Sequence, residues 1–251
     1  MAAEKSLAIV LRVVDFSESS CVVTLFTREL GKISGLAKGA RRPKSPFEAA
    51  LDLLALVRLV FLHKSSGALD ILTEARLERR FRAAASDLSS LYAAYYVIEL
   101  LDALTDEADP HPELFDAADE ALQALNGAGC DVAAEVLRFE MQLLRRLGHA
   151  PQLDACVECG SPLAEEPRVL FGQLAGGVVC ANCRVGMKQV VNVRREVIKT
   201  LARYAEDTSA WRQAPLEAGI RGELRGLVNQ YLANLLGRRP RMYGYLGMLA
   251  H

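Results

Sequence analysis

The sequence predicts an α+β protein of more than one domain, in which a small β-barrel precedes an α-helical region that carries an inserted four-cysteine hairpin. Three observations predict this class. Short runs rich in β-branched residues, separated by turn residues, occupy the first eighty positions. From about residue 81, apolar residues recur at helical spacing instead. Two CxxC pairs interrupt the helical pattern between about residues 152 and 192.

The barrel prediction rests on the number and length of the β-rich runs, which turn segments such as SESS and GARRPKSP separate. Five short strands within about eighty residues fit a small closed barrel, and the five-stranded oligonucleotide-binding (OB) barrel is one such solution. An SH3-like barrel fits the strand count nearly as well. We assign residues 1–80 to an OB-type domain and keep the SH3-like barrel as the alternative. The five runs are 7–16, 21–27, 31–37, 53–62 and 68–76.

The remainder, residues 81–251, is predicted to be a helical domain with the insert at about 152–192. Ser86 or Asp87 is the expected N-cap of the first helix and Asp131 that of the third, because short polar side chains accept hydrogen bonds from free N–H groups at a helix start. No internal repeat or low-complexity linker separates the helices. The predicted helical ranges are 86–104, 111–125, 130–148, 194–206 and 219–237.

Four cysteines form the most specific motif of the chain. Cys156 and Cys159 make one CxxC pair, and Cys180 and Cys183 make another. This spacing is typical of zinc sites in which two knuckle turns each direct two thiolates at one tetrahedral ion. Disulfides are the alternative, but redox CxxC pairs begin a helix within a strand–helix–strand unit that is missing here. We therefore predict one structural Zn²⁺; four thiolates leave no ligand position for water, so the metal is not expected to be catalytic.

Charge is unevenly distributed, although 30 Lys and Arg nearly balance 31 Asp and Glu. Residues 1–80 carry a net charge of +4, residues 83–137 contain twelve acids and no Lys or Arg, and residues 184–251 carry +7. Two basic ends around an acidic middle suggest a polyanionic partner. Solvated helix faces explain such charge blocks equally well.

The densest group of cations lies in LAKGARRPKSPF, residues 36–47, which holds Lys38, Arg41, Arg42 and Lys44. Cations on a loop suit phosphate contacts, which give affinity without reading sequence. The aromatic residues of this half offer little for base stacking, because they lie mostly in apolar runs and are expected in the core. These residues are Phe16, Phe26, Phe47 and Phe61.

No enzyme signature is complete. GARRPKS resembles a phosphate-binding loop, but Pro43 stands directly before Lys44, where that motif needs glycine. No apolar run reaches the roughly eighteen residues of a membrane span, and the first residues do not resemble a secretory signal. We expect a cytoplasmic protein that is not an enzyme and has no membrane partner.

Three segments together resemble the RecO family of bacterial recombination-repair proteins: GLAKGARRPKSPF, LRFEMQLLRRLGHAPQLDACVECG and LLGRRPRMYGYL. The resemblance implies an OB fold, a helical domain and a zinc module. It also implies binding to single- and double-stranded DNA, annealing of complementary strands, contact with the acidic C-terminal tail of single-stranded-DNA-binding protein, and, with RecR, help in loading RecA. The DNA-binding residues it implies are Lys32, Lys38, Arg41, Arg42 and Lys44.

The helix that contains AAEVLRFEMQLLRRLG carries arginines beside a wide apolar stripe. Because the resemblance implies that the helical domain binds an acidic-hydrophobic tail, we place the tail site near Arg138. The alternative is an internal pair between Arg138 and Glu135 or Glu140. For the whole chain, the alternative function is a scaffold in which barrel and zinc hairpin are architectural and the basic loop contacts RNA or an acidic protein.

Overall fold

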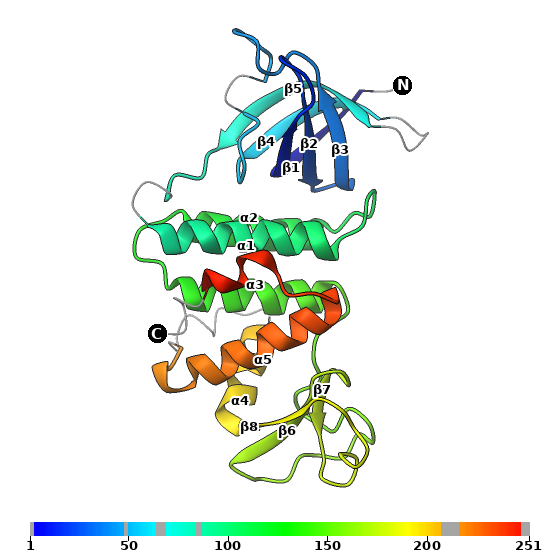
Figure 1. Cartoon of the computed structure of the whole chain (residues 1–251), viewed down its shortest axis with the longest axis vertical. Coiled ribbons are helices and arrows are strands. Elements are labelled where there is room, and N and C mark those ends of the chain that lie inside the picture. Colours follow the sequence, from blue (N-terminus) through cyan, green and yellow to red (C-terminus); the bar gives the residue numbers. More distant parts are fainter. Residues whose placement is uncertain (1–2, 48–49, 64–68, 84–86, 207–215, 247–251) are drawn as a thin grey trace. The chain divides into compact units, whose positions relative to one another are not determined.

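The computed structural model describes residues 3–47, 50–63, 69–83, 87–206 and 216–246 (Figure 1). The chain divides into two compact units, Met1–Cys130 and Asp131–His251. Within the described residues, no helix is long and apolar enough to cross a membrane. The two helices that directly follow the barrel belong to the first unit, so the predicted domain boundary at residue 80 would separate the barrel from helices in its own unit; that boundary stays a prediction.

A closed five-stranded barrel forms the core of the first unit, with the strand order β1-β2-β3-β5-β4. All neighbours are antiparallel except β3 and β5, which pair in parallel through Gly35 with Asp70 and Ala37 with Leu72. The register of β1 shifts between Val10 and Arg12, and the strand pairs with both β2 and β4. This order confirms the predicted OB-type barrel. The strands are β1 (Ala3–Asp15), β2 (Cys21–Thr27), β3 (Gly31–Ala37), β4 (Leu56–Leu62) and β5 (Asp70–Arg79).

Alternate side chains of these strands fill the barrel, as the period of two requires. The core also takes in Phe47 and Ala50, whose side chains are 3% and 0% exposed, from the segment between β3 and β4. That segment is tied to β5 as well, because the backbone N–H of Ala75 donates to the carbonyl of Pro46 at 3.3 Å. The chain therefore returns to the barrel directly after the basic loop.

Two helices, α1 (Leu88–Leu104) and α2 (Pro112–Leu125), complete the first unit and contact each other. Asp87 caps α1 by accepting a hydrogen bond from the backbone N–H of Ser89 at 2.9 Å. Ser86, the other predicted cap, lies outside the described residues. α1 contacts β1 and α2 contacts β2, so both helices pack on the barrel (Figure 1).

Part of the acidic middle of the sequence is paired rather than simply solvated. Arg28 and Arg79 of the barrel bind the carboxylates of Asp116 and Asp119 on α2. The Lys32 ammonium lies 3.6 Å from a carboxylate oxygen of Asp102 on α1. Because these acids lie in the helices and the cations lie on the barrel strands or, for Arg28, directly after β2, part of the charge separation along the sequence serves helix–barrel packing.

In its described residues, the second unit combines three α-helices and a 3₁₀ helix with a small sheet of order β7-β6-β8. Asp131 caps α3 through the backbone N–H of Ala134 at 3.2 Å, as the sequence predicts. Gly237 ends α5 in the left-handed conformation, with φ of +66°. α4 packs against α3 and against α5. The elements are α3 (Val132–Arg146), β6 (Arg168–Gly172), β7 (Gly177–Val179), β8 (Val190–Arg194), α4 (Arg195–Ala205), α5 (Ala218–Leu236) and the 3₁₀ helix η3 (Arg241–Gly244).

Candidate metal centre and nucleic-acid interface

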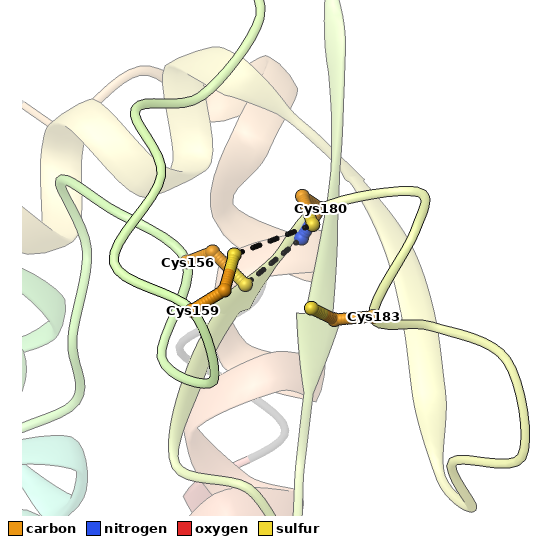
Figure 2. Close-up of side chains that lie close together, drawn as sticks. All are labelled: Cys156, Cys159, Cys180 and Cys183. Carbon is orange, nitrogen blue, oxygen red and sulfur yellow. Dashed lines mark hydrogen bonds between the residues drawn. The ribbon is translucent and has the colours of Figure 1, made fainter.

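The four cysteines converge in the second unit, as Figure 2 shows. Cys156 and Cys159 lie on a tight turn in which the Gly160 N–H donates to the Cys156 carbonyl at 2.8 Å. Gly160 has a φ of +69°, a conformation that side chains other than glycine adopt at a cost. Cys180 follows β7 directly, and Cys183 lies on the next turn. Each CxxC pair therefore forms the kind of knuckle that directs two sulfurs to one point.

The sulfur positions fit a single tetrahedral ion. All four Sγ atoms lie within 4.8 Å of one another, and those of Cys159 and Cys180 are 3.8 Å apart. Four sulfurs about 2.3 Å from a central zinc would be separated by about 3.8 Å. A disulfide would need about 2.05 Å, and all four thiols are free. The cluster can therefore hold a metal ion with four sulfur ligands.

The thiols also influence one another's ionisation. The backbone N–H of Cys180 donates to Cys156 Sγ at 3.3 Å and lowers the pKa of that thiol from 9.0 to about 6. Hydrogen bonding with Cys180 raises the pKa of Cys183 to about 12. One thiolate thus forms readily, whereas the last proton leaves only with difficulty. A divalent cation at the centre would supply the charge that keeps all four as thiolates at neutral pH.

The knuckles are supported by the small sheet rather than by a large core. The Val157 N–H donates to the carbonyl of Val178 in β7 at 2.9 Å, and the Arg184 N–H donates to the carbonyl of Cys180 at 3.1 Å. Val178 is fully buried. The strands beneath the knuckles bury Phe171 and Val179 as well, whereas the turns that carry the cysteines are largely exposed. Metal ligation is therefore the expected source of much of the stability of these turns.

The predicted basic loop is an exposed arch on the barrel. Lys38, Arg41, Arg42 and Lys44 are all exposed. Backbone hydrogen bonds from Arg42 to Gly39 and from Ser45 to Arg42, at 3.0 and 3.1 Å, shape the arch into consecutive turns. The buried Phe47 anchors its far end. The four cations of the loop therefore face solvent on a backbone that is fixed at both ends.

Two other predicted site residues are already engaged. The Lys32 side chain is only 12% exposed, and its ammonium donates to the backbone carbonyl of Asp102 at 2.6 Å. Arg138 is buried in α3 and donates through Nε and Nη2 to Glu135 Oε1 at 2.8 and 2.6 Å. The internal pair that the sequence left open for Arg138 is therefore present, with Glu135. DNA contact by Lys32 and tail contact by Arg138 stay predictions, and each would compete with these bonds.

Phe16 differs from the other barrel phenylalanines. Phe26, Phe47 and Phe61 are buried as expected, but Phe16 is 64% exposed. It follows the last residue of β1, where the apolar run ends and the turn begins. The expectation that Phe16 lies in the core is wrong, and the polar SESS that follows it was the signal that it belongs to the turn.

Comparison with known proteins accounts for nearly the whole chain. The family model described as recombination protein O N terminal matches residues 1–81, and that described as recombination protein O C terminal matches residues 85–243. The chain belongs to the RecO family. The two RecO models meet between residues 81 and 85, after the last barrel strand and before α1.

Several curated RecO proteins match over more than nine tenths of their own length. A DNA repair protein RecO of Rhodopirellula baltica is 41% identical over 96% of this chain and 97% of its own. Those of Myxococcus xanthus and Anaeromyxobacter dehalogenans are 34% and 36% identical, over 96% and 94% of this chain. Because both units are covered, RecO membership extends to the barrel with its basic loop and to the four-cysteine module alike.

Proposed function

We propose that this chain is a non-enzymatic mediator of recombinational DNA repair in the cytoplasm, which binds single- and double-stranded DNA and anneals complementary strands. Membership of the RecO family supports this proposal, because the similar proteins are named DNA repair proteins. The observation that carries it is the arch of exposed cations Lys38, Arg41, Arg42 and Lys44 on an OB-type barrel. Phosphate contacts from this arch would hold a strand without reading its sequence.

Annealing is compatible with this arrangement. A protein that neutralises phosphates lowers the repulsion between two strands, while contacts to phosphates leave the hydrogen-bonding edges of the bases free to pair. In the cell the proposed mediator acts with RecR to help load RecA on DNA that is covered by single-stranded-DNA-binding protein, and it contacts the acidic tail of that protein. The four cysteines hold one Zn²⁺, which stabilises the hairpin and takes no part in a reaction.

The proposal is tested by DNA binding at several salt concentrations. Each phosphate contact contributes a slope of about 0.7 for single strands and about 0.9 for duplex in a plot of log affinity against log salt. Replacing Arg41, Arg42 and Lys44 by alanine should therefore reduce the slope by about 2 for a single strand and by about 2.7 for duplex, and it should weaken all sequences alike. An RNA competitor that displaces DNA at equal concentration would instead favour the scaffold alternative.

The barrel offers a matched control. Lys5, Arg58 and Arg76 are exposed cations on β1, β4 and β5, and Arg58 and Arg76 face each other across the β4–β5 pair. Replacing these three by alanine removes the same charge from another part of the same barrel. We expect this control to keep the wild-type salt slope. If both triple variants keep the wild-type salt slope, the basic loop is only a solvated turn.

A further inference from the structure

The exposed ring of Phe16 stands on a closed turn between β1 and β2. The N–H groups of Phe16 and Ser17 both donate to the carbonyl of Ser20, at 3.0 and 3.1 Å. Two hydrogen bonds to one acceptor fix the backbone on which the ring is mounted. Val14, two residues earlier in β1, is also exposed, at 41%. The end of β1 thus presents apolar side chains to solvent on a rigid hairpin.

This turn is joined to the basic loop by three polar contacts. The Arg41 N–H donates to the Ser19 carbonyl at 3.1 Å, and the Gly39 N–H donates to Ser20 Oγ at 3.2 Å. Arg41 Nη1 also lies 2.7 Å from a carboxylate oxygen of Asp15, the residue before Phe16. The register explains this closeness, because Asp15 is opposite Cys21, and Cys21 is opposite Ala37 at the end of β3. In Figure 1 both segments leave the barrel at the end away from α1 and α2.

We infer that Phe16 is a stacking platform for an unpaired base of single-stranded DNA whose phosphates lie along the basic loop. The inference rests on the proposed function and adds to it a preference for single strands. A phenyl ring next to a row of cations combines the two elements of sequence-tolerant single-strand binding, a charged track and a π-face. Bases within a duplex are already stacked on each other and cannot use the ring.

Electrostatics favours a nucleic acid over an apolar or acidic-hydrophobic protein surface here. Besides the four loop cations, Arg12 is exposed on β1. Within residues 12–20 and 36–47, which the structure describes, the carboxylates are those of Asp15, which Arg41 pairs, and Glu18, which is exposed on the turn. Cations therefore outnumber acids in these two segments, and a strand with one negative charge per nucleotide matches them.

The test measures affinity for an oligothymidylate of about 12 nucleotides, within the range one OB fold covers, and for a duplex of equal length. Phe16→Ala should weaken the single strand about 5- to 150-fold, the range of one lost base–aromatic stack. Duplex affinity should stay within about twofold of wild type, and the salt slope should not change because no charge is removed. Since the ring is exposed, the thermal midpoint should also be unchanged.

Two further substitutions separate stacking from simple apolar contact. Phe16→Leu keeps apolar bulk but has no π-face, so it should lose nearly as much single-strand affinity as Phe16→Ala. Phe16→Trp should retain affinity and show fluorescence quenching on binding that exceeds that of the wild-type chain, whose single tryptophan is Trp211. Wild-type affinity in Phe16→Leu, or equal loss for single strand and duplex in Phe16→Ala, would overturn the inference.

Failure of the inference is distinguishable from failure of the proposed function. If wild-type protein binds DNA through the basic loop but Phe16→Ala binds the single strand equally well, only the stacking role is wrong. If Phe16→Ala binds DNA as wild type does but no longer binds a protein partner, the stacking role is again wrong. The turn would then be a protein contact. If removing Arg41, Arg42 and Lys44 leaves binding unchanged, the proposed function itself fails.

Discussion

Glu140 on α3 accepts two hydrogen bonds from Nη2 of Arg225 on α5, at 2.6 and 2.8 Å. The Glu140 side chain is fully buried and that of Arg225 is 7% exposed. Asn229, one turn further along α5, accepts a third bond from the same nitrogen at 3.1 Å. The pair thus links two helices that are far apart in sequence, and its charged groups are buried within the second unit.

Removing one partner of this pair should lower the free energy of unfolding strongly, because the charge of the other partner then stays buried without its counter-charge. We expect Glu140→Leu to lower the free energy of unfolding by about 3–5 kcal/mol, and Glu140→Leu/Arg225→Leu to recover most of that loss. The control is Glu78→Leu, which breaks the Arg58–Glu78 pair on the surface, 2.9 Å long, and should cost at most about 1 kcal/mol. Denaturant unfolding of the three variants measures these free energies. Equal losses for Glu140→Leu and Glu78→Leu would contradict the expected role of the buried pair.

Metal content provides a direct test of the cysteine cluster. We expect about one zinc per chain in protein purified without chelators, because the geometry supports one closed site. Cys159→Ser should lose the metal and loosen the hairpin while the barrel remains folded. Cys130→Ser is the matched control, since Cys130 lies outside the cluster, and it should keep its zinc. Elemental analysis measures the zinc content of both variants. Zinc retained in Cys159→Ser would show that the four cysteines are not the ligands of the zinc.

Metal retention should fall as the pH falls. The lowered pKa of Cys156, about 6, means that its thiolate is present above that pH and is protonated below it. In the metal-free protein, the lowered pKa of Cys156 adds to the free energy of unfolding. This contribution is fully present above the ordinary thiol pKa of 9.0 and is lost as the pH falls through about 6. Because protons compete with the metal for the thiolates, the zinc affinity measured against a chelator should fall as the pH is lowered. A zinc affinity that does not change with pH would contradict ligation by thiolates.

Gly31, at the turn between β2 and β3, should not tolerate alanine. Its φ is +71°, and a Cβ there would lie 2.1 Å from the carbonyl oxygen of Asp109, in the segment between α1 and α2. Gly129 is the matched control, with a φ of +75° and open space around it. Strain alone costs about 1–3 kcal/mol at such positions, so Gly129→Ala reports that cost. Thermal unfolding should show a clearly larger loss for Gly31→Ala; equal losses would mean that the turn can move away from Asp109.

The predicted tail site at Arg138 can be tested without losing the fold. Arg138→Glu would place a second carboxylate against the buried Glu135. We therefore compare two variants without this repulsion, the single variant Glu135→Gln and the double variant Glu135→Gln/Arg138→Gln. We expect the acidic tail peptide of single-stranded-DNA-binding protein to bind the first variant and to bind the second much more weakly. DNA affinity should be equal in both. Equal peptide affinity would place the tail site elsewhere and leave Arg138 with its internal pair alone.

Local patterns were sufficient for most of the elements and for the convergence of the four cysteines. The β-branched run Cys21–Thr27 became β2 with the predicted bounds, and the two CxxC spacings brought four sulfurs together. The choice between OB-type and SH3-like barrels was open because it depends on the parallel pairing of β3 with β5, which no local pattern encodes. Nor could spacing tell that Lys32 would meet Asp102, a residue seventy positions away.

The exposed Phe16 shows a different limit of pattern analysis. An apolar run marks a strand but not the residue at which the strand leaves the core. Leu11 is the last buried residue of β1, and Phe16 lies one residue beyond the end of the strand. Arg138 shows the reverse case, because a cation within an apolar stripe can be buried when an acid is three residues away on the same helix face. Both outcomes depend on packing that only the folded chain defines.

The parallel pairing of β3 with β5 also constrains how the chain can fold during synthesis. β1, β2 and β3 can pair as soon as residue 37 has left the ribosome, but the free edge of β3 waits for Asp70 and its neighbours. The unpaired N–H and C=O groups of such an edge can pair with a strand of another nascent chain until β5 occupies the edge. The basic loop begins directly after that edge strand, and we expect its charges to repel the same loop of a second copy. The same residues that we propose to attract DNA in the finished protein would thereby protect the unfinished one from aggregation.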